Sequence, residues 1–191
     1  FWNGYAEPLR NRITIDPRLS LSSMIGLNRF IIHEFTHVIT FEAMRSSAPM
    51  SKLFNTAGLP AWFSEGLAQY EAEFWAPEND RMLRLHTLNR SVLTPSERDV
   101  FVLLSDRGAE GYNEGYSIVK YWFETYGHDK VKKLLEIYRS SDNDFSEAVE
   151  RTFGKSIHVL EAEWREHLEA RYQQQIAERD ADIPQAKPIV P

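Results

Sequence analysis

The chain has 191 residues, of which 42% are hydrophobic and 26% charged, and a formal net charge of −6 at neutral pH. This length and composition predict one globular domain, and the acidic balance argues against a nucleic-acid-binding face. The chain contains no cysteine, which excludes thiol catalysis, disulfides and cysteine-based metal sites, and no apolar run approaches the length of a membrane span.

The N-terminal half predicts one short strand followed by helices. Arg12–Asp16 alternates polar and apolar residues, as half-buried strands do. Residues 23–44 contain no proline and predict a long helix. A second helix is expected from Pro60 to Trp75, with Pro77 ending it. Residues 78–93 fit either a strand or a short helix.

The C-terminal half predicts helices only. Thr94 and Glu97 form a capping box that opens a helix reaching to about residue 106. Further helices are expected over 112–126, 129–139, 145–153 and 156–179. Gly127 is expected to close the first of these, and the helix over 145–153 is expected to be capped by Asp144 with Glu147 and ended by Gly154. We therefore expect a single domain over residues 1–179 and a proline-containing linker or disordered tail over 180–191. Because the chain opens with Phe1 rather than Met, we expect it to be a fragment of a larger protein with possible additional domains.

The first long helix carries the pattern HExxH, formed by His33, Glu34 and His37. Residues four apart lie above one another on a helix, so both imidazoles can reach one metal ion, and zinc is the usual occupant. Glu34 borders the same face and can act on a water molecule as a general base without being a ligand. Alternatively, the two histidines are hydrogen-bonded core residues and Glu34 lies at the surface.

The helix around this pattern is rich in apolar residues, and its polar residues fall on one narrow stripe. A solvated face is normally broader and richer in lysine and glutamate. The pattern therefore predicts a buried helix on which a metal compensates the polar stripe.

A catalytic zinc usually has three protein ligands, and Glu65 is the best source of the third. It lies near the start of an apolar helix, beside Gly66, whose missing side chain permits close approach of another helix. Alternatively, Glu65 only complements the helix dipole. The other histidines are expected to be ordinary surface or core residues: His86, His128, His158 and His167.

With HExxH, the stretch Trp62-Phe63-Ser64-Glu65-Gly66-Leu67-Ala68 resembles the gluzincin zinc metallopeptidases, in the pattern of the alanyl-aminopeptidase and leukotriene-hydrolase type enzymes. Tyr112-Asn113-Glu114-Gly115 is similar to their Y-x-K-G motif, with Glu114 in place of the lysine. The later part of the chain contains Tyr126-Gly127, then Phe153-Gly154-Lys155-Ser156 leading to Glu163-Trp164. This part resembles the small bacterial domains called peptidase MA-like. No G-x-M-E-N block precedes residue 33, which leaves endopeptidase and exopeptidase action open.

The resemblance implies a zinc site with His33, His37 and Glu65 as ligands, and Glu34 as the catalytic base. It also implies that Tyr112 stabilises the oxyanion during peptide hydrolysis. Tyr116, one turn further on the same face, is the alternative donor, and both tyrosines also fit the edge of a core.

Together these observations predict a helix-dominated α+β, zincin-like domain with short N-terminal strands, an HExxH helix and a C-terminal helical bundle. The expected function is zinc-dependent hydrolysis of a peptide or protein substrate. The alternative is a zinc-binding domain that recognises peptides or acts as a scaffold, with weak or lost activity. The family resemblance suggests a periplasmic or extracellular location.

Overall fold

The computed structural model describes residues 4–7, 10, 12–16, 24–44, 59–73, 75–100, 107–140 and 144–182. A β-hairpin precedes a series of helices, which confirms the predicted helix-dominated α+β class. The elements are β1 (Gly4–Glu7), β2 (Arg12–Ile15), α1 (Met24–Ala43), α3 (Ala61–Glu71), α4 (Pro77–Leu88), α5 (Pro95–Asp99), α6 (Gly108–Tyr126), α7 (His128–Tyr138), α8 (Phe145–Phe153) and α9 (Ile157–Asp182).

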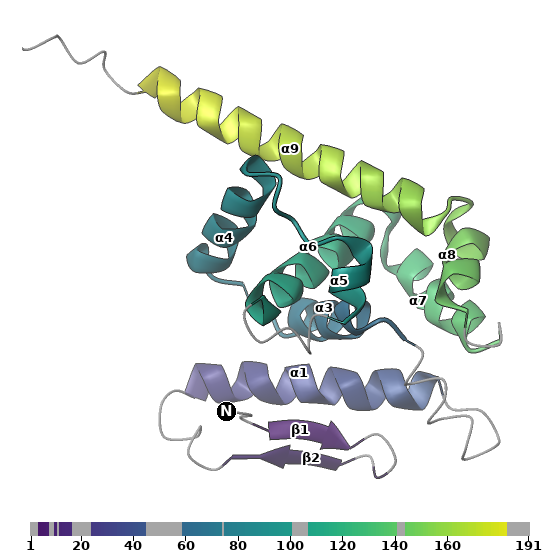
Figure 1. Cartoon of the computed structure of the whole chain (residues 1–191). Coiled ribbons are helices and arrows are strands. Elements are labelled where there is room, and N and C mark those ends of the chain that lie inside the picture. Colours follow the sequence, from purple (N-terminus) through teal and green to yellow (C-terminus); the bar gives the residue numbers. More distant parts are fainter. Residues whose placement is uncertain are drawn as a thin grey trace, which may run out of the picture.

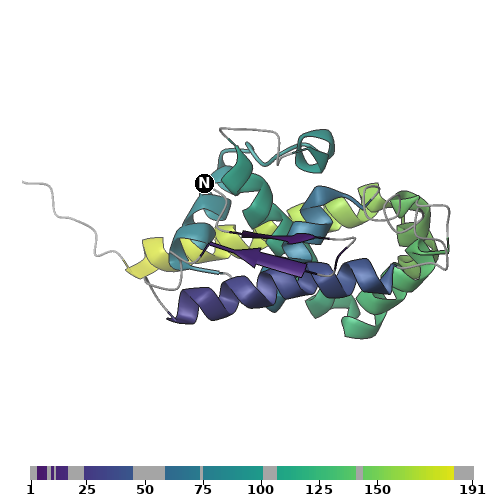
Figure 2. The same ribbon diagram turned by 90° about the horizontal axis from the view of Figure 1, so that it is seen from below.

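The hairpin, α1 and the remaining helices form successive layers (Figure 1). The two strands are antiparallel, with Gly4 opposite Ile15 and Glu7 opposite Arg12, and an ion pair joins Glu7 to Arg12. Seen from below, the hairpin lies across α1 (Figure 2). Helix α1 is thus held between the hairpin on one side and α3 on the other.

Helices α3 and α6 form the centre of the helical body. A side chain at Gly66 would clash with the backbone of Gly115, and one at Gly115 would clash with the carbonyl of Trp62. The two helices therefore touch backbone to backbone, as the sequence predicts for Gly66. Beside this contact between α3 and α6, Trp62 packs edge-on against Trp122, with ring centroids 5.6 Å apart.

Several helix ends follow the predicted capping signals. The Thr94 hydroxyl accepts from the Glu97 backbone N–H, and the Asp144 carboxylate accepts from that of Glu147. Gly127 and Gly154 end α6 and α8 with positive φ values of 84° and 70°. These ends were predictable because each depends on a few neighbouring residues.

Other boundaries differ from the prediction. The helix after Pro60 ends at Glu71, because Glu73 adopts a left-handed conformation with φ 52°, and Pro77 opens α4 rather than ending α3. Residues 78–93, left open between strand and helix, are largely helical.

Three further helix boundaries also differ from the prediction. Helix α6 begins four residues before the predicted start. Helix α5 ends at Asp99, and residues 101–106, to which the prediction extended it, lie outside the described residues. Helix α9 continues to Asp182, three residues into the expected tail, whereas residues 183–191 lie outside the described residues. No helix in the described ranges is both long and apolar enough to cross a membrane.

Candidate metal centre

His33, His37 and Glu65 come together where α1 packs against α3. Nε2 of His33 lies 3.3 Å from Nε2 of His37 and 3.2 Å from Oε2 of Glu65, and the His37–Glu65 distance is 3.5 Å. Within the described part of the chain, these three residues form the one group with metal-ligand spacing. The structure thus brings together the three predicted ligands.

The donor triangle fits a tetrahedral zinc site. Ligand atoms at about 2.0–2.2 Å from a tetrahedral zinc ion lie about 3.3–3.6 Å from one another. The three measured separations, from 3.2 to 3.5 Å, lie close to that range. Two imidazoles and one carboxylate are also the donor set of many catalytic zinc sites, which keep the fourth position open.

The charges of the three ligands are coupled. Burial opposes ionisation of Glu65, but hydrogen bonds from His33 and His37 and their charges outweigh it, so the pKa of Glu65 falls to about 2. Burial opposes protonation of His37, yet hydrogen bonding to Glu65 raises its pKa overall. The two imidazoles thus keep Glu65 ionised, and an ionised carboxylate is the form that can bind a metal.

Ser64 contacts the other side of the second histidine. Its hydroxyl oxygen lies 3.3 Å from Nδ1 of His37. With the Nδ1–H donating to this oxygen, Nε2 keeps its lone pair for a metal. The ring of Phe41 stacks on the same imidazole, with centroids 5.9 Å apart, and restricts its rotation. The sequence reasoning missed Ser64, because a single serine before a glutamate carries no signal.

Glu34 lies beside the ligands without joining them. It is 6% exposed, and its carboxylate accepts a hydrogen bond from the backbone N–H of Ala6 on β1. Burial raises the pKa of Glu34 above its ordinary value, against the opposing charges of His33 and His37. A carboxylate with a raised pKa accepts a proton more readily, as a general base must.

The two tyrosines predicted as alternatives occupy different surroundings. Burial raises the pKa of Tyr112, and the charges of Glu65 and Glu34 raise it further, so the phenol lies within their electrostatic reach and keeps its proton at neutral pH. Tyr116 instead stacks on Trp75, with centroids 4.4 Å apart and the rings 15° from parallel. Of the two, Tyr112 is the one whose pKa responds to the metal-centre carboxylates.

The apolar side of α1 is not buried as the sequence predicts. Phe35 and Ile39 are each 52% exposed, whereas Glu34 and His37 are only 6% and 7% exposed. The polar stripe faces α3, and part of the apolar face is open to solvent. The prediction of a buried helix was therefore wrong for this side of α1, although the stripe itself lies where the pattern placed it.

The remaining histidines lie apart from the centre. His86 pairs with Glu110 at 3.3 Å, and His128 packs against Phe123 at 4.4 Å. His158 and His167 are exposed on α9. Their prediction as ordinary surface or core residues agrees with these positions.

Comparison with protein-family models gives a match over most of the chain. A family model described as the Peptidase MA superfamily matches residues 4–170. No curated protein and no solved structure matches the chain significantly. The matched range begins at β1, includes every predicted site residue and ends within α9.

Proposed function

Because the chain belongs to the Peptidase MA superfamily, we propose that it is a zinc-dependent metallopeptidase of the gluzincin type. The observation that carries this proposal is the triangle of donor atoms from His33, His37 and Glu65 beside a buried carboxylate, Glu34. The earlier resemblance to aminopeptidase motifs supports the same assignment. A site with only a structural role would not need Glu34, a second acidic residue that is not a ligand, beside it.

In the proposed reaction, His33, His37 and Glu65 would hold zinc between α1 and α3. Zinc, when bound, supplies Lewis acidity that makes a water molecule acidic near neutral pH. Glu34 takes the proton from this water as its oxygen attacks the peptide carbonyl carbon. The same carboxyl group then delivers the proton to the leaving amine nitrogen, so the base is regenerated.

Tyr112 is proposed to stabilise the transition state. Its phenol stays protonated at neutral pH because burial and the nearby carboxylates raise its pKa. It can therefore donate a hydrogen bond to the carbonyl oxygen as that atom becomes negative.

Metal analysis combined with peptide digestion tests the proposal. The wild-type protein is expected to bind one zinc ion per chain and to cleave members of a peptide library, with cleavage abolished by a chelator and detected by mass spectrometry. His33→Ala and Glu65→Ala are expected to lose zinc. Full zinc occupancy in either variant would contradict that ligand assignment.

Glu34→Gln separates catalysis from metal binding. The amide is nearly isosteric but is not a usable base, so this variant is expected to keep zinc and to lose about 10²–10⁴-fold in hydrolysis rate. Zinc binding without cleavage by the wild-type protein would favour the alternative, a peptide-recognition or scaffold domain.

A further inference from the structure

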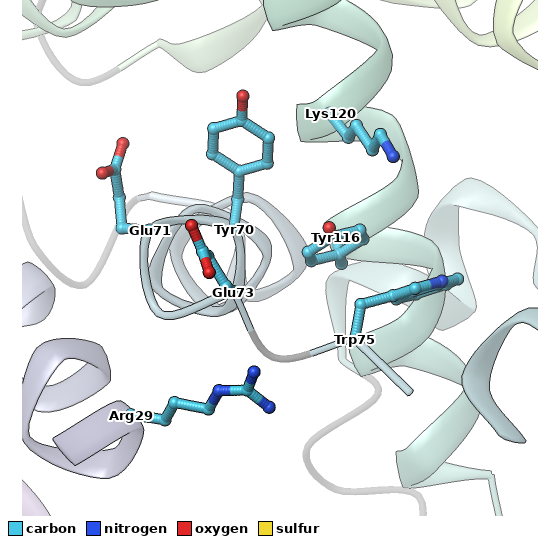
Figure 3. A pocket seen from close by; sticks show the side chains of 7 residues that line it. All are labelled: Arg29, Tyr70, Glu71, Glu73, Trp75, Tyr116 and Lys120. Atoms are coloured by element: carbon cyan, nitrogen blue, oxygen red, sulfur yellow. The ribbon is translucent and has the colours of Figure 1, made fainter. Parts of the chain in front are cut away.

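A cavity of about 550 Å³ is lined by residues of α1, α3 and α6, with Trp75 and Tyr116 in its wall (Figure 3). Carboxylates and cations are equally represented in its lining, which contains Glu71, Glu73, Arg29 and Lys120. The charges of the cavity therefore select no class of ligand.

The contact between the hairpin and α1 involves the proposed base, Glu34. A side chain at Gly4 would come within 2.7 Å of the Phe30 ring, so β1 lies directly on α1 at this point. Two residues further along the strand, the backbone N–H of Ala6 donates a hydrogen bond to the Glu34 carboxylate. Two strand residues span about 6.7 Å and four helix residues about 6 Å, so the two contacts follow one another in register along both elements. The strand is thus fixed on α1 at two points, and the second of them is Glu34.

The N–H of Ala6 is not needed within the hairpin. Ala6 lies opposite Ile13 in the antiparallel pair. In such a ladder, opposite residues alternate between pairs that exchange hydrogen bonds and pairs whose N–H groups point away from the partner strand. Because the N–H of Ala6 serves Glu34, Ala6 and Ile13 form a pair of the second kind. The N–H of Ile13 therefore points to the outer edge of β2.

Glu34 depends on this donor because other partners are directed elsewhere. The Nε2 atoms of His33 and His37 lie 3.2 and 3.5 Å from Glu65. In the described part of the chain, no side chain donates a hydrogen bond to Glu34, which is only 6% exposed. A buried carboxylate needs a donor to compensate its lost hydration, and its rotatable bonds give it several orientations. A single backbone N–H thus both compensates and orients this carboxylate.

We propose that the backbone N–H of Ala6 positions the Glu34 carboxylate for proton transfer. The strand holds one carboxylate oxygen and leaves the other directed at the proton that Glu34 takes from water. A general base must lie within about 2.6–3.2 Å of its proton, so a carboxylate that turns freely spends less time in the productive geometry. This proposal rests on the proposed peptidase function. It makes Ala6 a positioning residue that acts through Glu34.

Replacing one amide by an ester tests this role. Lactic acid, incorporated at residue 6 by nonsense suppression, keeps the methyl group of Ala6 and replaces its N–H by an ester oxygen. We expect kcat to fall by about 10- to 10²-fold, because a displaced catalytic group slows the reaction strongly. KM and zinc content should remain those of the wild type.

The hydroxy-acid analogue of isoleucine at Ile13 is the matched control. It makes the same amide-to-ester change in the opposite residue, whose N–H points away from β1. This protein is expected to keep the wild-type kcat. An equal loss of kcat in the two esters would show that the stability of the hairpin matters and would overturn the positioning role.

A second background separates positioning from general damage to the fold. In Glu34→Asp the carboxylate is one methylene shorter and does not reach the strand, while a base is still present. The ester at residue 6 should then change kcat very little. A loss by the same factor in both backgrounds would mean that the ester acts independently of Glu34 and would contradict the proposal.

The hydrogen bond itself can be observed without turnover. NMR of the wild-type protein labelled with ¹³C and ¹⁵N is expected to show a scalar coupling between the Ala6 amide nitrogen and the Glu34 carboxyl carbon. Absence of the coupling in a protein that cleaves peptides would overturn the positioning role alone. A coupling in a protein that cleaves no peptide would support the contact and contradict the proposed peptidase.

Discussion

The hydroxyl oxygen of Ser64 lies 3.3 Å from Nδ1 of His37, and the next residue along α3 is the proposed ligand Glu65. One turn of α3 therefore supplies both a proposed metal ligand and a partner for a second ligand. Hydrogen bonds to the outer nitrogen of a metal-binding histidine fix its orientation and tautomer. Ser64 thus couples the position of α3 to the orientation of the His37 imidazole on α1.

Ser64→Ala is expected to weaken zinc binding by about tenfold, because His37 loses the partner that fixes its Nδ1 proton. Competition with a chromophoric chelator measures the affinity, and circular dichroism checks the fold. Ser64→Thr keeps the hydroxyl and is expected to bind zinc almost as the wild type does. Weakened binding in Ser64→Thr as well as in Ser64→Ala would show that packing, not the hydrogen bond, matters here.

Gly66→Ala is expected to push α3 away from α6, because the new methyl group would overlap the Gly115 backbone. Overpacking of this kind costs about 1–3 kcal/mol of unfolding free energy. Since Glu65 is the adjacent residue, zinc affinity should fall as well. Urea unfolding of the metal-free protein and chelator competition measure the two effects.

Gly127→Ala is the control for this substitution. A methyl group there meets no atom within 4 Å, but φ is 84°, so the cost is backbone strain alone. Stability should fall while zinc affinity remains that of the wild type. A loss of zinc affinity equal to that of Gly66→Ala would show that the α3–α6 contact does not specifically position Glu65.

The three residues of the candidate metal centre could be predicted to lie together because their signals are local. The HExxH spacing places His33 and His37 on one side of a helix, and Glu65 lies in a second recognisable motif. Helix caps such as Thr94 and Asp144 were predictable for the same reason. Local spacing in the sequence was thus enough to identify the residues and the helices that form the candidate metal centre.

The side of a helix that the rest of the chain covers depends on tertiary packing, which local patterns do not show. Periodicity shows that Phe35 and Ile39 share a side of α1, but not that this side is exposed. The cavity lined by Trp75 and Tyr116 could not be predicted either, because it depends on the left-handed turn at Glu73 that brings Trp75 back over α6. No composition signal marks that turn, since glycine is the usual residue at such a position.

Glu114, which departs from the Y-x-K-G motif, is buried in a charged cluster. Its carboxylate accepts from the Leu93 backbone N–H at 3.0 Å and lies 3.3 Å from the Arg98 guanidinium. Arg98 is 1% exposed and also binds Glu161 through two hydrogen bonds, of 2.7 and 2.8 Å. The cluster joins α5, α6 and α9 two residues beyond Tyr112.

This cluster makes stability depend on pH. Burial raises the pKa of Glu114 from 4.5 to about 7, despite the opposing charge of Arg98. Between these values the folded protein binds the proton and the unfolded chain releases it, so unfolding free energy falls as pH rises from about 5 to 8. The shift corresponds to a loss of about 3 kcal/mol.

Urea unfolding at pH 5 and pH 8 measures this effect. Glu114→Gln cannot ionise, so its stability relative to the wild type should increase between the two pH values by about 3 kcal/mol. Glu166→Gln, on the exposed face of α9, should show no such change. A constant difference between wild type and Glu114→Gln at both pH values would show that Glu114 stays ionised in the folded protein.

Tyr112→Phe is expected to lower kcat while leaving KM and zinc content nearly unchanged. The phenol would contact the carbonyl oxygen mainly once that atom becomes negative, so its loss raises the barrier without weakening substrate binding. Removing one such donor typically costs about 10²–10³-fold in kcat. Steady-state kinetics on a cleaved peptide from the library, with zinc analysis of each variant, measures these quantities.

Tyr116→Phe is the matched control, because Tyr116 lies one turn further along α6 and stacks on Trp75. The pKa of Tyr116 does not respond to Glu34 or Glu65, so removal of its hydroxyl should leave kcat nearly unchanged. A large loss of kcat in Tyr116→Phe but not in Tyr112→Phe would exchange the roles of the two tyrosines. Wild-type kinetics in both variants would show that neither hydroxyl contacts the substrate, and that the oxyanion is stabilised without a tyrosine.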